Sequence, residues 1–409
     1  MNKFLNTLSD GKVMVDKVFK AAVACDEAKQ KYGDIVIDGT LGTLFDENGI
    51  LVAYDSIWST YEKIDKIQKA KYASSIQGNP DFNQAVYDWL FSGLNIDIPC
   101  EVIASPGGAG AISSTMKNVL NPGETVIKPN LGWGPYKTMA IECALTLTDY
   151  NMFNGNNFDL ENFKTVLSEV MEKQKRVLVI INDPCHNPSG YTMTIQEWDE
   201  VIQFVNELSS QGPVVILNDI AYVDYTNQGN TWKKSFEKFN NISENVMVVV
   251  AFSCSKTLTA YGARVGAQVV LTKDKAQLKA FKDAAIYSAR STWSTVNNSV
   301  MKLFSTIMND DFLKNNYLKE KAYYINLLKE RSAIFLKEAA EVNLEIYPYV
   351  EGFFITLKFP NQREKAAFNL KLQKNNIFLV EVDGGLRVAI CTIPKRKIKG
   401  LAKRIKALM

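Results

Sequence analysis

Short β-branched runs alternate with segments of helical periodicity through the middle of the chain, and this alternation constrains the fold more than any other feature. The pattern is typical of strands in a mostly parallel sheet covered by helices. The expected strands are residues 101–104, 125–128, 145–148, 177–181, 214–218, 246–251 and 267–271. The expected helices between them are residues 110–120, 136–143, 160–172 and 195–209. The sequence therefore predicts an α/β fold with a mostly parallel central sheet flanked by helices.

The two ends of the chain follow other patterns. Residues 1–30 are typical of an arm or helix, and a short strand is expected at residues 35–42. Two long helices are expected at residues 295–308 and 311–343. After them we expect a strand (353–359), a helix (362–375), two strands (377–381 and 385–390) and a final helix. This α+β order and the length of 409 residues predict more than one domain. We expect an N-terminal arm that is part of a small domain (1–45), a large domain (46–309) and a C-terminal small domain (310–409).

Composition argues against several classes of protein. The formal net charge is only +3, so nucleic-acid binding is not expected. The sequence contains no run of about eighteen apolar residues, so a membrane span is not expected either. Six scattered cysteines without an apolar leader segment indicate reduced thiols in the cytoplasm. The basic stretch 394–406 has apolar residues at helical spacing and is expected to be a solvated amphipathic helix rather than a binding patch. A single histidine, His186, excludes a histidine-rich metal site and leaves proton transfer to lysine, tyrosine or carboxylates.

The segment Ser253-Cys254-Ser255-Lys256 follows an expected strand, and Arg264 comes eight residues after the lysine. Hydroxyls and a guanidinium are groups that hold a phosphate dianion. A lysine amine becomes nucleophilic where burial or a neighbouring cation disfavours its ammonium form. The combination suggests a Schiff base between Lys256 and pyridoxal phosphate, although a surface lysine beside serines is the commoner arrangement.

Three further polar clusters follow expected strands, where the ligands of open α/β sheets collect. The glycine loop 105–111 is either a plain turn or an anion site at a helix N-terminus. The turn 187–190 is either an ordinary tight turn or part of the site. A cis bond after Asn187 would direct the side-chain amide of Asn187 toward the cleft. Asp219 is either a loop cap or a carboxylate that keeps a pyridine nitrogen protonated. Tyr222 is placed to donate to the cofactor's phenolic oxygen.

Two more side chains stand out. Trp133 lies between two glycines and is either a core aromatic or a ring that stacks flat on a cofactor. Arg387 lies in an apolar strand, where it needs a carboxylate partner. That partner is either an internal salt bridge or the α-carboxylate of a substrate.

These segments stand in the order and at the spacing of a known family over most of the chain. The chain resembles the class I pyridoxal-phosphate-dependent aminotransferases of fold type I, and most of all their aspartate and aromatic amino-acid branch. The joint pattern is very specific, whereas each match alone could be chance. The matching segments are Leu41-Gly42, 46–49, Tyr72, 106–111, Trp133, 185–190, 219–222, 253–256, Arg264, 290–294, 352–354 and Arg387.

The resemblance implies pyridoxal 5′-phosphate as cofactor, no metal, and a homodimer with sites at the subunit interface. Lys256 would bind the cofactor and move a proton between Cα and C4′, and Asp219 would hold the pyridinium. Tyr222 and Asn187 would contact the phenolic oxygen, and Trp133 would stack on the ring. The residues implied for the phosphate are Gly107, Gly108, Ala109, Ser253, Ser255, Arg264 and, from the neighbouring subunit, Tyr72.

The resemblance also implies how substrate binds. Arg387 would hold the α-carboxylate, with Gly42, Trp133 and Asn187 beside it. Arg290 would reach across the dimer to a distal carboxylate, which favours aspartate, glutamate and 2-oxoglutarate without excluding aromatic substrates. Ala109 departs from the family's usual threonine, and one lost hydrogen bond of about 1–3 kcal/mol leaves cofactor binding intact. The glycine-rich loop 130–136, and a tryptophan at 293 where tyrosine is usual, affect specificity more than the reaction.

We therefore predict an aminotransferase of amino-acid metabolism and biosynthesis that moves the amino group between an L-amino acid and a 2-oxo acid by a ping-pong mechanism. The alternative is a lyase on the same scaffold, acting by β-elimination or decarboxylation, but a lyase has little need of Arg290. A cofactor-sensing regulator would need a DNA-binding module, for which residues 1–30 are too few. The sequence does not set the preferred donor, the acceptor or the pathway.

Overall fold

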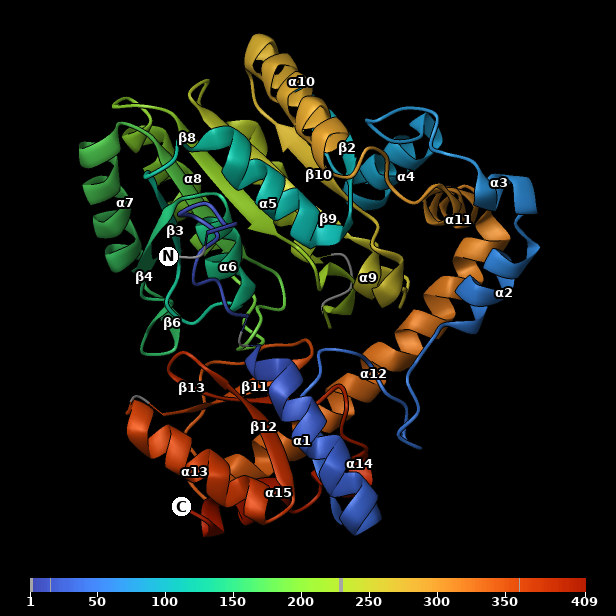
Figure 1. Ribbon diagram of the computed structural model, residues 1–409, viewed down its shortest axis with the longest axis vertical. Helices are drawn as coiled ribbons and strands as arrows, with labels where there is room; N and C mark the ends of the chain where they lie inside the picture. Colours follow the sequence, from blue (N-terminus) through green and yellow to red (C-terminus); the bar gives the residue numbers. More distant parts are fainter. Residues whose placement is uncertain (1–2, 15, 228–230, 360) are drawn as a thin grey trace.

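The computed structural model describes residues 3–14, 16–227, 231–359 and 361–409, and two main sheets dominate this part of the chain (Figure 1). The larger sheet has seven strands in the order β2-β10-β9-β8-β7-β3-β4. Their bounds are β2 Cys100–Ser105, β3 Thr125–Pro129, β4 Thr146–Tyr150, β7 Val177–Asn182, β8 Val214–Asp219, β9 Val246–Ser253 and β10 Gly266–Leu271. All seven strands predicted from the sequence are therefore confirmed.

One strand of this sheet, β10, runs antiparallel to both of its neighbours, and the other pairs are parallel. The sheet is thus mostly parallel, as predicted. Gly266, the first residue of β10, pairs with Ser105 at the end of β2 and with Ser253 at the end of β9. The ends of β2 and β9 consequently lie on either side of the same glycine.

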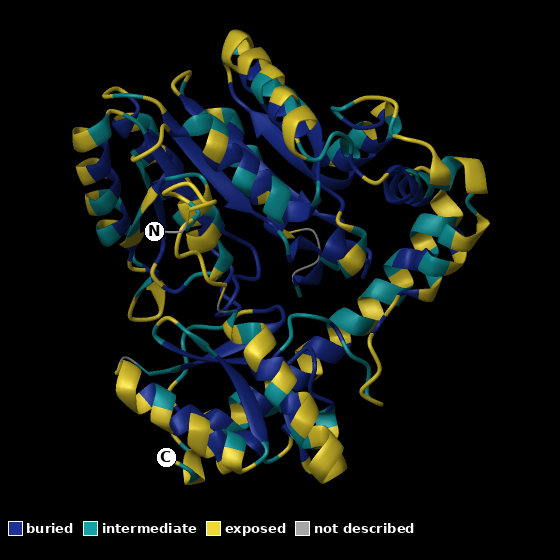
Figure 2. Cartoon of the chain, in the orientation of Figure 1, coloured by how far each residue is buried: buried dark blue, intermediate teal, exposed yellow. Residues whose placement is uncertain are grey.

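Helices cover both faces of the large sheet, and its strands are buried between them (Figure 2). Alternate residues of β7 belong to different hydrophobic clusters, Val179 to one and Ile180 to the other, as expected for a strand covered on both faces. The cluster that contains Ile180 is formed with α5 Gly107–Val119, α6 Pro135–Glu142 and α10 Lys275–Thr292. The other is formed with α4 Pro80–Phe91, α7 Leu160–Gln174, α8 Ile195–Leu208 and α11 Asn298–Met308. The sequence analysis named no helix at the position of α10.

The helix α8 illustrates why these segments are helical. It begins at a capping box in which Thr194 Oγ1 accepts from the Glu197 N–H at 3.1 Å and the Glu197 carboxylate accepts from the Thr194 N–H at 2.8 Å. Its buried residues Trp198, Val201 and Val205 recur at helical spacing on one face. The helix is thus fixed at its start by the cap and along its length by burial of that face.

The second sheet has four strands in the order β1-β12-β13-β11 and joins the two ends of the chain. Ile37 of β1 pairs in parallel with Ile377 of β12. The strand bounds are β1 Ile37–Gly39, β11 Phe354–Lys358, β12 Ile377–Val382 and β13 Gly385–Ala389. The helices around this sheet are α1 Lys17–Tyr32, α13 Gln362–Lys374, α14 Lys395–Ile398 and α15 Leu401–Ala407. Residues 1, 2 and 15 of the predicted N-terminal arm lie outside the described part.

The long helix α12, Asp311–Glu341, runs from the side of the large sheet to the small one (Figure 1). Its Arg331 is fully buried, donates to the backbone carbonyls of Cys391 and Asp46, and forms an ion pair with Glu47 at 2.7 Å. The remaining short elements are α2 Asp55–Lys63, α3 Lys66–Ala70, α9 Cys254–Thr257 and the hairpin of β5 Phe153–Asn154 with β6 Asn157–Phe158.

The basic C-terminal stretch forms two helices, α14 and α15, separated at Gly400. Its apolar side chains Ile398, Leu401 and Ile405 are buried, which confirms the amphipathic pattern. The basic side chains are largely paired with carboxylates, as in Arg396 with Asp34. Within the described residues, no helix is long and apolar enough to cross a membrane.

Candidate active site

The ends of β2, β8 and β9 deliver the predicted site residues to one edge of the large sheet. Asp219 is the last residue of β8, and Ser253 is the last residue of β9. α5 begins at Gly107, two residues after β2 ends. Since these strands run in the same direction, their carboxyl ends meet where the sequence analysis expected a shared site.

Lys256 is the third residue of α9. Its Nζ donates to the Gly42 carbonyl and lies 4.6 Å from the centroid of the Tyr261 ring and 5.5 Å from that of Tyr222. Burial lowers the pKa of the Lys256 amine from 10.5 to about 8. Because the Tyr261 and Tyr222 rings and the Gly42 carbonyl surround Nζ, the neutral and nucleophilic amine is favoured.

An anion cradle lies beside the lysine. Gly107 has a φ of 74°, and a Cβ added there would lie 2.9 Å from Arg264 Nη2, so only glycine lets the guanidinium approach the start of α5. Arg264 Nη1 donates to Ser255 Oγ at 3.2 Å, and Ser253 Oγ accepts from the Ser255 N–H at 3.2 Å. A Cβ added at Gly108 would touch Ser253 Cβ at 3.4 Å. A guanidinium, two hydroxyls and the N-terminus of α5 therefore converge, as a phosphate site requires.

Asp219 is buried and hydrogen-bonded through both carboxylate oxygens. Tyr136 Oη donates to Oδ2 at 2.7 Å, and the Ala221 N–H donates to Oδ1 at 3.1 Å. Burial raises the pKa of the Asp219 carboxyl, while these two donors act in the opposite direction. Tyr136 also meets the Trp133 ring edge-on, with centroids 5.4 Å apart.

The turn at Asn187 connects Asp219 with Arg387. Asn182 Nδ2 donates to the Asp219 carbonyl at 2.7 Å, and Asn182 Oδ1 accepts from the Asn187 N–H at 2.7 Å. Arg387 Nη1 donates to Asn187 Oδ1 at 3.2 Å. The bond from Asn187 to Pro188 is cis, the geometry that the sequence analysis considered, and the bond from Asp183 to Pro184 is also cis.

Arg387 is the second buried cation of the site and is only 4 % exposed. Its Nη2 donates to the Thr40 carbonyl at 2.6 Å, and its guanidinium lies 4.2 Å from the centroid of the Phe354 ring. In the part of the chain that the structure describes, its Nε has no hydrogen-bond partner. Among the described residues, no carboxylate forms an ion pair with it. The internal salt bridge that the sequence left open is therefore not found.

Two predicted residues lie apart from this group. Tyr72 is 83 % exposed, and Arg290, near the end of α10, is exposed and donates to Ser294 Oγ at 2.6 Å. Within the described chain, neither is hydrogen-bonded to the other predicted site residues. Ala109 lies in the first turn of α5 and brings no polar side-chain atom to the cradle.

The sequence analysis gave no role to several side chains of the site. Tyr136 donates to Asp219, Tyr261 covers Lys256 and accepts from the Leu44 N–H at 3.0 Å, and Phe354 packs against Arg387. A weak signal was present: Tyr136 comes three residues after Trp133, and Tyr261 lies between Lys256 and Arg264. Aromatic residues at such positions are more often simple core residues.

His186 is not part of this chemistry. The side chain is fully buried, and its Nδ1 shares a hydrogen bond with Ser189 Oγ at 2.7 Å. Burial lowers the pKa of the imidazole to about 3. The ring is therefore neutral at physiological pH and supports the turn, in line with the expectation that other groups carry protons.

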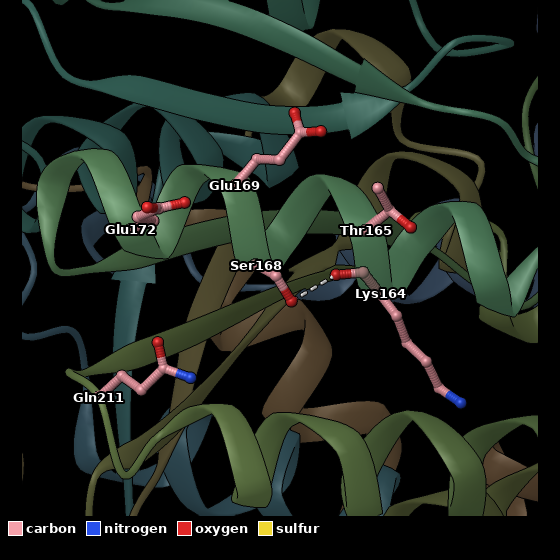
Figure 3. Close-up of a pocket in the computed structure, with 6 residues that line it drawn as sticks. All are labelled: Lys164, Thr165, Ser168, Glu169, Glu172 and Gln211. Atoms are coloured by element: carbon pink, nitrogen blue, oxygen red, sulfur yellow. Dashed lines mark hydrogen bonds between the residues drawn. The ribbon is translucent and has the colours of Figure 1, made fainter.

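A hollow on the surface lies elsewhere, along α7 (Figure 3). It measures about 630 Å³ and is wide open to solvent. It contains none of the predicted site residues; the residues that line it are Lys164, Thr165, Ser168, Glu169, Glu172 and Gln211. Because these side chains are polar and mostly exposed, the hollow is a surface groove without the buried charges of the lysine site.

Comparison with known proteins agrees with this geometry. The family Aminotransferase class I and II matches residues 45–405. The chain belongs to this family. The crystal structure of an aminotransferase from Anaerococcus prevotii DSM 20548 is 31 % identical, has a TM-score of 0.95, and covers 99 % of this chain and 98 % of that chain.

Relatives whose names specify a substrate have lower sequence identity to this aminotransferase. The aspartate aminotransferase of Salmonella typhi is 23 % identical over 309 residues, which cover 72 % of this chain and 76 % of that protein. The aromatic-amino-acid aminotransferase of Paracoccus denitrificans is 22 % identical over 288 residues, which cover 69 % of this chain and 71 % of that protein. Family membership makes the protein a transaminase and disfavours the lyase alternative.

The cofactor of the aminotransferase is pyridoxal phosphate, and the residues present fit it. The cradle at Gly107 and Arg264 matches a phosphate dianion, and Lys256 has the low pKa that bond formation with an aldehyde requires. Asp219 presents a buried carboxylate to one side. No metal is needed for such a site, and the described residues contain no group of three or more histidine, cysteine or acidic side chains placed to bind one.

Proposed function

We propose that this aminotransferase moves the amino group between an L-amino acid, dicarboxylic or aromatic, and a 2-oxo acid in two half-reactions at one site. The environment of Arg387 carries the proposal. Its guanidinium is buried without an ion-pair partner among the described residues, and its Nε is unpartnered. A buried charge without a counter-ion is costly. The α-carboxylate that amino acids and 2-oxo acids share would supply that counter-ion in both half-reactions.

The other residues take complementary roles in this proposal. When bound, pyridoxal phosphate supplies a conjugated pyridinium that accepts the electron pair left at the substrate α-carbon. Asp219 holds the proton on the pyridine nitrogen, and Tyr222 and Asn187 contact the phenolic oxygen. Trp133 stacks on the ring. Lys256 Nζ would move a proton from the substrate Cα to C4′ of the cofactor in the first half-reaction and from C4′ to Cα in the second.

The phosphate would be held by the residues of the cradle together with a neighbouring subunit. In this proposal the ligands are Gly107, Gly108, Ala109, Ser253, Ser255, Arg264 and the neighbouring subunit's Tyr72. Gly42 lines the substrate side, where its carbonyl already accepts from Lys256. We propose a cytoplasmic homodimer. The exposure of Tyr72 and Arg290 supports the dimer, because both side chains are free to reach the partner's site.

We further propose the domain division 1–45, 46–309 and 310–409, with the first and last parts forming a small domain that closes over substrate. The pairing of β1 with β12 supports this grouping, since it joins the N-terminal part to the C-terminal sheet. The enzyme would serve amino-acid metabolism, including biosynthesis.

The visible absorption spectrum tests the reaction. The protein with pyridoxal phosphate should show an absorption band that Lys256→Ala abolishes while the far-ultraviolet circular dichroism stays unchanged. Adding L-aspartate or L-tyrosine should convert the band to that of the aminated cofactor, and 2-oxoglutarate should restore it. A band that stays unchanged, or that changes only with release of pyruvate or carbon dioxide, would contradict transamination.

Arg290→Ala tests substrate recognition. If Arg290 binds a distal carboxylate, the variant should lose about ten- to a hundredfold in kcat/KM for aspartate, the cost of one charge-assisted hydrogen bond, and far less for phenylalanine or tyrosine. Lys279→Ala, a substitution of another exposed cation on α10, serves as the control. Equal losses for both kinds of substrate would remove Arg290 from this role.

A further inference from the structure

Among the residues that the structure describes, Tyr136 is the one buried side-chain donor to the Asp219 carboxylate. It is the second residue of α6 and is fully buried. Its Oη lies 2.7 Å from Asp219 Oδ2, and the other oxygen, Oδ1, accepts from the Ala221 N–H. The two residues are 83 positions apart in the sequence, so tertiary packing alone brings them together.

The proton of this hydrogen bond belongs to the phenol. Burial raises the pKa of the Tyr136 hydroxyl, and the adjacent Asp219 carboxylate raises it further. Tyr136 therefore stays protonated and donates, while Asp219 accepts. A donor of this kind favours the ionised form of a carboxylate.

Asp219 needs such a donor because no cation balances it. Among the described residues, it forms no ion pair with lysine, arginine or histidine. Tyr136 of α6 and Tyr222 of its own loop interact electrostatically with Asp219, and Tyr150 of β4 interacts with Tyr136. Burial favours the neutral acid, and the hydroxyl of Tyr136 and the Ala221 N–H oppose it.

We propose that Tyr136 is a positioning residue that keeps Asp219 ionised and fixes the orientation of its carboxylate toward the pyridine nitrogen of the cofactor. The same ring meets Trp133 edge-on, so one side chain orients both the acceptor for the ring nitrogen and the indole beside it. The inference rests on the role proposed above for Asp219. A protonated Asp219 has one fewer acceptor site and no negative charge for a pyridinium.

Tyr136→Phe tests the inference, because it removes one oxygen and keeps the ring against Trp133. The measurement is the dissociation constant of pyridoxal phosphate from the apoenzyme between pH 6 and pH 9, followed by quenching of tryptophan fluorescence. Loss of the donor raises the pKa of Asp219, so binding should weaken about ten- to a hundredfold at the acidic end and approach wild type at the alkaline end. Tyr136→Gln, which retains an N–H donor, should recover part of the affinity.

Controls separate this role from simple packing. Tyr150→Phe removes another buried hydroxyl, which donates to the Ile180 carbonyl at 3.1 Å, and should leave the pH dependence unchanged. In an Asp219→Asn background, Tyr136→Phe should have no further pH-dependent effect. If Tyr136→Phe fails to fold, the comparison of Tyr136→Gln with wild type decides, since it should keep a near-wild-type pH profile.

Three results would overturn the inference or, separately, its basis. A loss of affinity in Tyr136→Phe that is the same at every pH would make Tyr136 a packing residue only. If Asp219→Asn weakens binding while Tyr136→Phe binds like wild type, Tyr136 is also excluded, but the function proposed for Asp219 stands. If Asp219→Asn binds the cofactor as tightly as wild type, the role proposed for Asp219 itself fails.

Discussion

The amine of Lys256 illustrates how surroundings set the chemistry of a single residue. Burial lowers its pKa, and the nearby guanidinium groups of Arg387 and Arg264 act in the same direction, while Cys391 acts against them. A lysine in water is almost fully protonated at neutral pH. At a pKa of about 8, a fraction of the Lys256 amines is neutral near pH 7 and can act as a nucleophile.

The rate at which the apoenzyme captures pyridoxal phosphate should therefore rise with pH. Above a pKa of about 8 the Lys256 amine is mostly neutral, so the rate should have its midpoint there and not near 10.5. Stopped-flow absorbance at fixed cofactor concentration measures it. Binding of pyridoxamine phosphate, which forms no bond with lysine, should lack this midpoint. A rate that rises only near pH 10 would show that Lys256 is solvated in the apoenzyme.

At this scale the sequence identified the residues whose chemistry is distinctive. Lys256, Asp219 and Arg387 are unusual side chains at the ends of recognisable strands or within one, so pattern alone drew attention to them. Tyr136 and Tyr261 carried no comparable signal, because a tyrosine near a helix or turn is usually a core residue. Their roles depend on contacts between segments far apart in the chain, which pattern does not encode.

At the scale of elements, periodicity predicted the existence of the seven strands but not the direction of β10. A run of apolar residues is the same read either way, so its antiparallel insertion between β2 and β9 follows only from the fold. That insertion places Gly266 between two strand ends that carry site residues. A Cβ added there would lie 2.3 Å from the Phe252 carbonyl oxygen and 2.8 Å from the Gly107 carbonyl carbon.

Gly266→Ala should therefore disturb the phosphate cradle. The methyl group would push β10 away from β9 or from Gly107, at a cost of about 1–3 kcal/mol. We expect a lower melting temperature and cofactor binding weakened by about tenfold. Gly262→Ala is the matched control, since a Cβ there meets nothing within 4 Å. Calorimetry and fluorescence titration measure both effects, and wild-type affinity in Gly266→Ala would show that the cradle tolerates the shift.

At the scale of the whole molecule, the sequence indicated a change of pattern near residue 310 but not how the ends meet. The parallel pairing of β1 with β12 spans most of the chain, and Arg331 ties α12 to backbone carbonyls before and after it in the sequence. Contacts also cross between the two sheets: Thr356 Oγ1 of β11 donates to the Pro188 carbonyl at 2.6 Å. These pairings minimise unsatisfied buried groups in three dimensions, a condition that local periodicity cannot express.

The proposed homodimer can be tested by mixing two inactive or impaired variants, because each site would need residues from both subunits. Consider a hybrid dimer of one subunit with Lys256→Ala and one with Arg290→Ala. If Arg290 serves the partner's site, one site of this hybrid lacks both side chains and the other site is intact. Mixing equal amounts and allowing subunit exchange should restore about a quarter of wild-type activity on aspartate, since half of the dimers are hybrids with one working site. Each variant alone should be inactive or strongly impaired with aspartate. Steady-state assays before and after exchange measure the gain, and activity that never exceeds the average of the two variants would place Arg290 in its own subunit's site or outside the site altogether.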